Sequence, residues 1–177
     1  VYVRLSLSVL FLMRRRPPRS TLFAYTKLFR SAARLANVKR VIHMSSGCSQ
    51  LAYEWEDDLP YGRLANGPDD EVPSSWRMIE LSDPVRPDSP YAVGKIFGET
   101  LGRYYADRYG ISTIAIRLGA VLPDDRPQIR RHYPGFLSQA ACVQMIDKCI
   151  DAPDACQFVI LNPTSPGSAP PRERLSH

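Results

Sequence analysis

The sequence lacks the residue groupings that hold structural metals or disulfide frameworks. Its 177 residues include four cysteines and three histidines. No C-x-x-C pair occurs and the histidines lie far apart, so the spacing of a zinc site is missing. Cys142, Cys149 and Cys156 follow one another at intervals of seven, which favours small buried residues over ligands. We therefore expect no metal, reduced thiols and a cytoplasmic location.

Long apolar runs and N-terminal acidic residues are missing as well. The apolar stretch at residues 3–13 is too short to cross a bilayer, and its arginines follow it rather than precede it, unlike those of a secretory signal. Residues 1–30 hold seven basic side chains and no acidic one, out of 23 basic and 18 acidic in the whole chain. The net charge of +5 therefore belongs to the first thirty residues, and we expect neither a nucleic-acid nor a membrane partner.

Both ends of the chain differ in character from its middle. Residues 11–31, FLMRRRPPRSTLFAYTKLFRS, resemble the peptide produced when sequencing-adapter DNA is translated, so residues 1–31 are predicted to be a non-native segment. The alternative is a basic arm that binds phosphate. Residues 162–177 contain four prolines without periodicity and are predicted to be a disordered or frame-shifted tail. The organised domain is expected at residues 32–161.

Within that domain, apolar runs and helical patterns alternate as a parallel α/β fold requires. A short helix and a buried strand open it, a long irregular segment follows, and a capped helix leads to a second apolar strand. A further helix and strand close it. The predicted ranges are 32–37, 40–45, 47–88, 90–109, 113–118, 138–151 and 158–161.

The helix at residues 90–109 is the best-defined of these elements. Ser89 is a suitable N-cap, Pro90 fits the first turn, and Gly110 fits the end. Apolar side chains recur along it at helical spacing, which predicts an amphipathic helix. They are Val93, Phe97, Leu101 and Tyr104.

Tyr91 and Lys95 lie four residues apart near the start of this helix and therefore share one face. A tyrosine ordinarily loses its proton near pH 10, and an adjacent ammonium lowers that pKa. Ser45 and Ser46 end a predicted strand, at the edge where parallel sheets bind ligands. These residues predict a proton-transfer site. The alternative is an ordinary surface tyrosine and a solvated lysine, because this spacing is common.

Three ordered segments carry a resemblance to a known family. Ser89 to Glu99, SPYAVGKIFGE, resembles the S-P-Y-x-x-x-K-x-x-x-E signature of extended short-chain dehydrogenases/reductases, also called NAD-dependent epimerases/dehydratases. Residues 41–46, VIHMSS, resemble that family's strand ending in the catalytic serine or threonine. Residues 116–121, IRLGAV, resemble its R-x-x-x-V segment beside the substrate site. Together they cover residues 40–122.

The resemblance implies a fold and a set of residue roles. The fold is an α/β, partial Rossmann-like parallel sheet that lacks its first βαβ units. Tyr91 is implied as the catalytic acid/base, and Lys95 as the residue that lowers its pKa and touches the nicotinamide ribose, so both contact the cofactor, NAD or NADP. Ser46, preferred over Ser45, is implied as the hydrogen-bond donor to substrate. Arg117 is either a substrate-binding residue or a strand-edge charge.

Two departures from the family pattern stand out. The glycine-rich turn G-x-x-G-x-x-G, which cradles the pyrophosphate, does not occur in the sequence. In addition, 45 positions separate Ser46 from Tyr91, which predicts an inserted lid-like loop that either shapes the substrate pocket or is inert. Gly47 and Cys48 stand where the family's dehydratases carry Asp-Glu, which disfavours dehydration.

The sequence thus predicts a fragment of an NAD(P)-dependent epimerase or dehydrogenase. Its implied small-molecule substrate is a sugar, uronate or nucleotide sugar that reacts at a hydroxyl by hydride transfer. A homodimer is one assembly that the resemblance allows for the parent protein. Two alternatives remain open: a non-catalytic NAD(P)-binding regulatory protein, and an inactive product of a mis-assembled gene.

Overall fold

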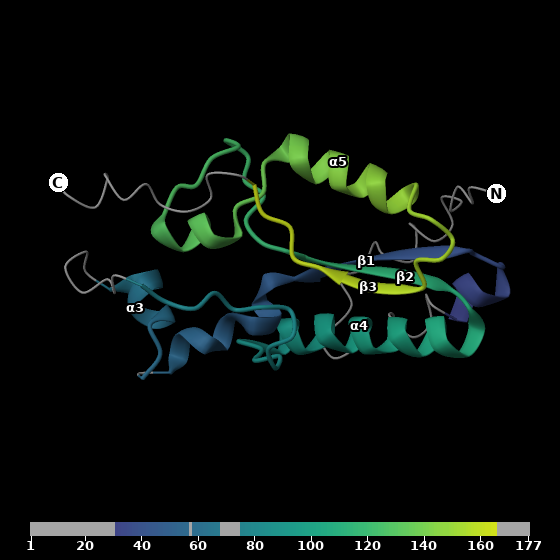
Figure 1. The fold of residues 1–177 in the computed structure, drawn as a ribbon, viewed down its shortest axis with the longest axis horizontal. Helices are drawn as coiled ribbons and strands as arrows, with labels where there is room; N and C mark the ends of the chain where they lie inside the picture. The colour runs from purple at the N-terminus through teal and green to yellow at the C-terminus, as the bar shows by residue number, and fades with distance from the viewer. Residues whose placement is uncertain (1–30, 57, 68–74, 166–177) are drawn as a thin grey trace, which may run out of the picture.

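The protein contains a three-stranded parallel sheet in the order β1-β2-β3, with a helix on each face (Figure 1). The structure is a computed structural model that describes residues 31–56, 58–67 and 75–165. Its strands are β1 (Arg40–Ser46), β2 (Ser112–Leu118) and β3 (Phe158–Leu161). Its helices are η3 (Gly47–Trp55), α3 (Tyr61–Asn66), α4 (Pro90–Tyr109), η5 (Arg130–Gly135) and α5 (Gln139–Ile150). Residues 31–35 are also helical.

The central strand β2 lies between β1 and β3 and is buried on both faces. Its largely apolar sequence explains this position, because a strand covered on both sides presents neither face to water. Ile114 and Ile116 face α5, in a core that Ile42, Met44 and Cys149 complete. This confirms the parallel α/β fold that the sequence predicts.

The helix α4 begins and ends at the predicted caps. Ser89 Oγ accepts a hydrogen bond from the backbone N–H of Ala92, and Gly110 ends the helix with a positive φ of 66° that glycine adopts without strain. The face that α4 turns to the sheet consists largely of small residues, however. Its buried members are Ala92, Gly94, Gly98, Glu99, Gly102, Tyr105 and Ala106.

Small side chains let the α4 backbone come close to β1 and β2. Of the apolar residues that the sequence places at helical spacing, Leu101 packs against a buried cluster, whereas Val93 and Tyr104 are exposed and Phe97 is half-buried. An interpretation of these residues as one inner apolar face would be wrong. On this helix, the small size of a side chain determines burial beside the strands more than its hydrophobicity does.

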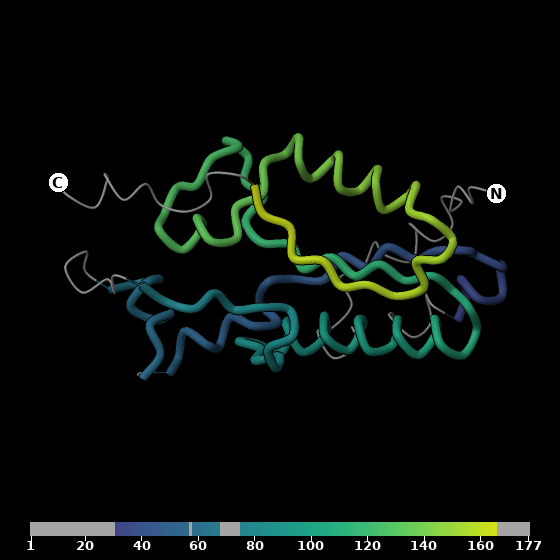
Figure 2. Tube along the Cα trace, viewed as in Figure 1, coloured from purple at the N-terminus to yellow at the C-terminus, as the bar shows by residue number. Residues whose placement is uncertain are grey.

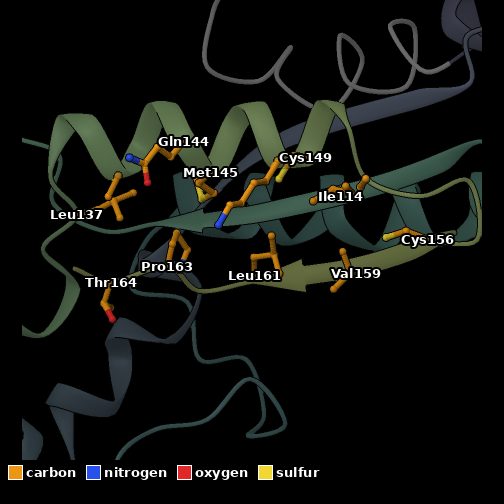
Figure 3. Close-up of a pocket in the computed structure, with 13 residues that line it drawn as sticks. Ile114, Leu137, Gln144, Met145, Cys149, Cys156, Val159, Leu161, Pro163 and Thr164 are labelled. Atoms are coloured by element: carbon orange, nitrogen blue, oxygen red, sulfur yellow. The ribbon is translucent and has the colours of Figure 1, made fainter. Parts of the chain in front are cut away.

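The helix α5 covers the opposite face of the sheet, as the trace in Figure 2 shows. Ser138 caps it by accepting a hydrogen bond from the N–H of Ala141. Between α5 and the strands lies an apolar pocket of about 360 Å³, with Met145, Cys149, Val159 and Leu161 among the residues that line it (Figure 3). The surrounding burial raises the pKa of the Cys149 thiol.

The segment between β1 and α4 is more regular than the sequence predicts. It folds into η3 and α3, and its last residues return alongside η3. The backbone N–H of Ala52 donates to the carbonyl of Arg86, and the N–H of Arg86 donates to the carbonyl of Ser49. Tyr53 Oη donates to the carbonyl of Pro84. These bonds fold the segment back onto the residues that follow β1.

Some predictions fall outside the described residues. The proposed non-native segment lies there except for residue 31, and so does most of the 162–177 tail. In the part of the chain that the structure describes, no helix is long and apolar enough to cross a membrane.

Candidate active site

The candidate site lies where β1 ends, at the carboxyl edge of the parallel sheet. Ser46 is the last residue of β1 and the N-cap of η3. Its Oγ accepts a hydrogen bond of 3.2 Å from the backbone N–H of Cys48. Because this bond uses an oxygen lone pair, the Ser46 O–H can still donate. The side chain is therefore oriented by the start of η3 and retains the capacity expected of a donor to substrate.

Tyr91 and Lys95 occupy the first turns of α4 and meet as their spacing predicts. The Lys95 Nζ lies 5.2 Å from the centroid of the Tyr91 ring, within range of a cation–π contact. The same ammonium donates a 2.6 Å hydrogen bond to the carbonyl of Met44 on β1. Tyr91 is 52% exposed, so its phenol is accessible from solvent. An ammonium fixed beside an accessible phenol has the geometry that a proton-transfer pair requires.

Of the expected triad Ser46, Tyr91 and Lys95, the structure brings Lys95 directly against Tyr91. It connects Lys95 to Ser46 only through the backbone of β1. The carbonyl that Lys95 contacts belongs to Met44, two residues before Ser46 on the same strand. Among the described residues, no direct hydrogen bond links Ser46 to Tyr91.

Arg117 lies inside the protein rather than at its surface. Its side chain is 3% exposed and forms two hydrogen bonds with Glu99 of α4, Nε to Oε1 at 3.0 Å and Nη2 to Oε2 at 2.8 Å. The interpretation of Arg117 as a strand-edge charge is wrong, since β2 is the central strand of the described sheet. Its third nitrogen, Nη1, is buried and has no hydrogen-bond partner among the described residues.

Three residues with no expected role surround the predicted ones. Glu99, itself 3% exposed, accepts a hydrogen bond from Ser45 in addition to those from Arg117. The ring of His43 packs against Gly98, and His43 Nε2 lies 3.1 Å from the carbonyl of Lys95. Glu99 stood in the signature at Lys95 + 4, and a buried arginine needs a buried acid, but the sequence alone does not show that these two residues face one another.

The segment after β2 borders the same edge of the sheet. Arg131 of η5 forms an ion pair with Glu54 of η3, and that hydrogen bond raises the pKa of the arginine. Arg130 donates to the carbonyl of Gly67, which follows α3. These contacts tie η5 to the inserted segment. The two loops that leave β1 and β2 are thereby fixed to one another beside Ser46.

The site fits one end of a nicotinamide dinucleotide. An exposed phenol and an ammonium next to each other can hydrogen-bond ribose hydroxyls, which are neutral groups that both donate and accept. The sequence offers no glycine-rich turn for the pyrophosphate. In the described ranges, no group of three or more His, Cys, Asp or Glu side chains is arranged for a metal ion. The residues present therefore suit the ribose end of such a cofactor.

Similarity to known proteins places this parallel α/β sheet, with Tyr91 and Lys95 at its carboxyl edge, in a protein family. Residues 19–152 match the profile of the NAD dependent epimerase/dehydratase family. The chain belongs to this family. The match begins at residue 19, inside the segment 1–31 that the sequence predicts to be non-native.

Characterised relatives are sugar dehydrogenases. L-arabinose 1-dehydrogenase (NAD(P)(+)) of Haloferax volcanii is 31% identical over 130 residues, 68% of this chain and 48% of that protein. Uronate dehydrogenase of Pseudomonas putida is 33% identical over 129 residues, 73% of this chain and 40% of that protein. The chain therefore spans about half the length of these relatives or less.

A solved structure agrees with this relationship. Uronate dehydrogenase from Agrobacterium tumefaciens superposes with a TM-score of 0.60 at 25% identity, over 80% of this chain and 44% of that one. The shared fold is Rossmann-like, as expected from the sequence.

Proposed function

We propose that this chain is the catalytic half of an NAD(P)-dependent dehydrogenase that oxidises a sugar or a sugar acid at a ring hydroxyl. The observation that carries the proposal is the Tyr91–Lys95 pair: an accessible phenol beside an ammonium that β1 holds in place. Family membership supplies the reaction class, and the sugar dehydrogenases among the relatives support the substrate class.

In the proposed reaction, Tyr91 removes the proton from the substrate hydroxyl while the carbon that bears this hydroxyl loses a hydride. When bound, a nicotinamide dinucleotide accepts that hydride. Lys95, whose ammonium lies beside the Tyr91 ring, contacts the ribose. Ser46 donates a hydrogen bond to the reacting oxygen. Ser45 is the weaker candidate for that role, because its hydroxyl already donates to Glu99.

The proposed substrate is a free uronate or aldose rather than a nucleotide sugar. Two relatives that are more than 30% identical to this chain act, by their names, on arabinose and on uronates. The inserted segment and η5 lie together beside the edge of the sheet, and we propose that they form the substrate-side wall. Epimerisation and dehydrogenation share the same first step, so the test distinguishes them by their products.

The test supplies the missing phosphate-binding half from a relative. Residues 32–165 replace the matching region of Pseudomonas putida uronate dehydrogenase, whose own N-terminal part remains. We expect reduction of NAD or NADP with glucuronate, galacturonate or arabinose, followed by the absorbance of the reduced nicotinamide. A folded chimera that binds the cofactor but turns over none of these sugars, nor a nucleotide sugar, would contradict the proposal and support the non-catalytic alternative.

A further inference from the structure

A buried carboxylate connects the three elements that carry the candidate site. Glu99 lies one turn beyond Lys95 and two beyond Tyr91 on the same stripe of α4. It accepts hydrogen bonds from Arg117 of β2 and from Ser45 of β1. Ser45 and Arg117 are directly opposite one another in the β1–β2 register. A single carboxylate thus fixes α4 to two adjacent strands at once.

This arrangement contributes more to geometry than to stability. A buried ion pair loses most of its Coulombic gain to desolvation, and an apolar pair of similar volume is often at least as stable. A bidentate arginine–carboxylate contact, by contrast, fixes the distance and the rotation of both partners. The cluster formed by Ser45, Glu99 and Arg117, here called the buried charge cluster, therefore determines where α4 sits against the sheet.

Its position couples this geometry to the candidate site. Ser45 immediately precedes Ser46, and the Lys95 ammonium contacts the Met44 carbonyl on the other side of Ser45. Lys95 and Glu99 are separated by about 6 Å along a continuous helix, so a slide or rotation at Glu99 moves Lys95 with it. The Lys95 carbonyl also lies within hydrogen-bond distance of His43 Nε2.

We infer that Glu99, with Arg117 and Ser45, is a positioning residue that holds Tyr91 and Lys95 of α4 in catalytic register with Ser46 of β1. Arg117 then acts through Glu99 and does not touch the substrate. The catalytic part of this inference rests on the proposed function. Its structural part, that the buried charge cluster fixes the first turns of α4, is independent of the proposed function.

The first test is kinetic and uses the chimera described above. Glu99→Gln keeps the side-chain size and removes the charge. We expect kcat to fall about 10- to 100-fold, because a displacement of about 1 Å of catalytic groups costs that much, while KM changes little. Asp107→Asn is the matched control: Asp107 pairs with Arg103 on the exposed side of the same helix. Its kcat should remain that of the unmodified chimera.

A second variant separates positioning from stability. In Glu99→Leu/Arg117→Met, an apolar pair replaces the buried charges, and we expect the thermal midpoint to recover relative to Glu99→Gln. The inference expects kcat to stay low, because the directional contact with Ser45 is still missing. If both kcat and the thermal midpoint recovered, the inference would be overturned, because the cluster would then contribute only to the packing of the core.

A third readout does not depend on turnover. Amide hydrogen exchange should quicken at residues 91–95 and at 44–46 in Glu99→Gln and stay unchanged in Asp107→Asn. Unchanged exchange at both segments in folded Glu99→Gln would overturn the inference. If the unmodified chimera folds and binds the cofactor but shows no turnover, the proposed function fails, and the exchange experiment still decides whether the cluster positions α4.

Discussion

Single side chains determine how closely α4 approaches the sheet. Gly98 faces the imidazole of His43, and a Cβ built on Gly98 would lie 2.3 Å from two atoms of that ring. No side chain other than hydrogen fits there without a shift of the helix or the histidine. Because Gly98 lies three residues after Lys95, such a shift also reaches the candidate site.

Gly98→Ala should therefore destabilise the protein by about 1–3 kcal/mol, the usual cost of overpacking a buried contact. Chemical denaturation measures this difference. His43→Ala removes the obstructing ring, so the double variant Gly98→Ala/His43→Ala should lose less stability than the sum of the two single variants. Strict additivity would show that the Gly98–His43 contact does not limit the approach of α4.

The roles of individual residues divide into those that local patterns predict and those that depend on the fold. Tyr91 and Lys95 share a helix, so four-residue spacing is enough to predict their contact. Arg117 depends on which strand lies in the middle of the sheet and which acid faces it, and no local pattern carries that information. Glu99 was visible in the signature, but its two partners lie on β1 and β2, far away in sequence.

At the scale of elements, strand and helix positions follow directly from the sequence. β3 has the predicted bounds, and β1, β2, α4 and α5 differ from prediction by one residue at most at either end. Caps explain this agreement, because Ser89, Gly110 and Ser138 fix helix ends locally. The segment 47–88 was expected to be irregular. It contains η3 and α3 because contacts with residues up to 77 positions away stabilise them, as between Glu54 and Arg131.

The orientation of α4 yields an element-scale prediction. Val93 is 44% exposed, whereas its neighbour Ala92 is fully buried against the sheet. Val93→Ser should change the free energy of unfolding by less than about 0.5 kcal/mol. Ala92→Val should cost about 1–3 kcal/mol, because the added methyl groups have no space. A larger loss for Val93→Ser than for Ala92→Val would mean that the apolar spacing, and not the small residues, defines the inner face.

At the scale of the whole molecule, the sheet ends at β1 on one side and β3 on the other in the described residues. The chain matches less than half the length of its sugar-dehydrogenase relatives, and its sequence carries no glycine-rich turn for a dinucleotide pyrophosphate. Under the proposed function, Tyr91 and Lys95 therefore work together with a phosphate-binding turn that this sequence does not contain. For this reason the tests of function join this chain to a half that has the turn.

The central claim is that Tyr91 transfers the proton in a dehydrogenase reaction, and the kcat of Tyr91→Phe in the chimera tests it most directly. Tyr104→Phe is the control, since Tyr104 is an exposed tyrosine on the same helix. Loss of a general acid/base predicts a kcat about 10²- to 10⁴-fold lower for Tyr91→Phe, with the thermal midpoint little changed and Tyr104→Phe unaffected. A Tyr91→Phe chimera that turns over sugar at the unmodified rate would contradict the account.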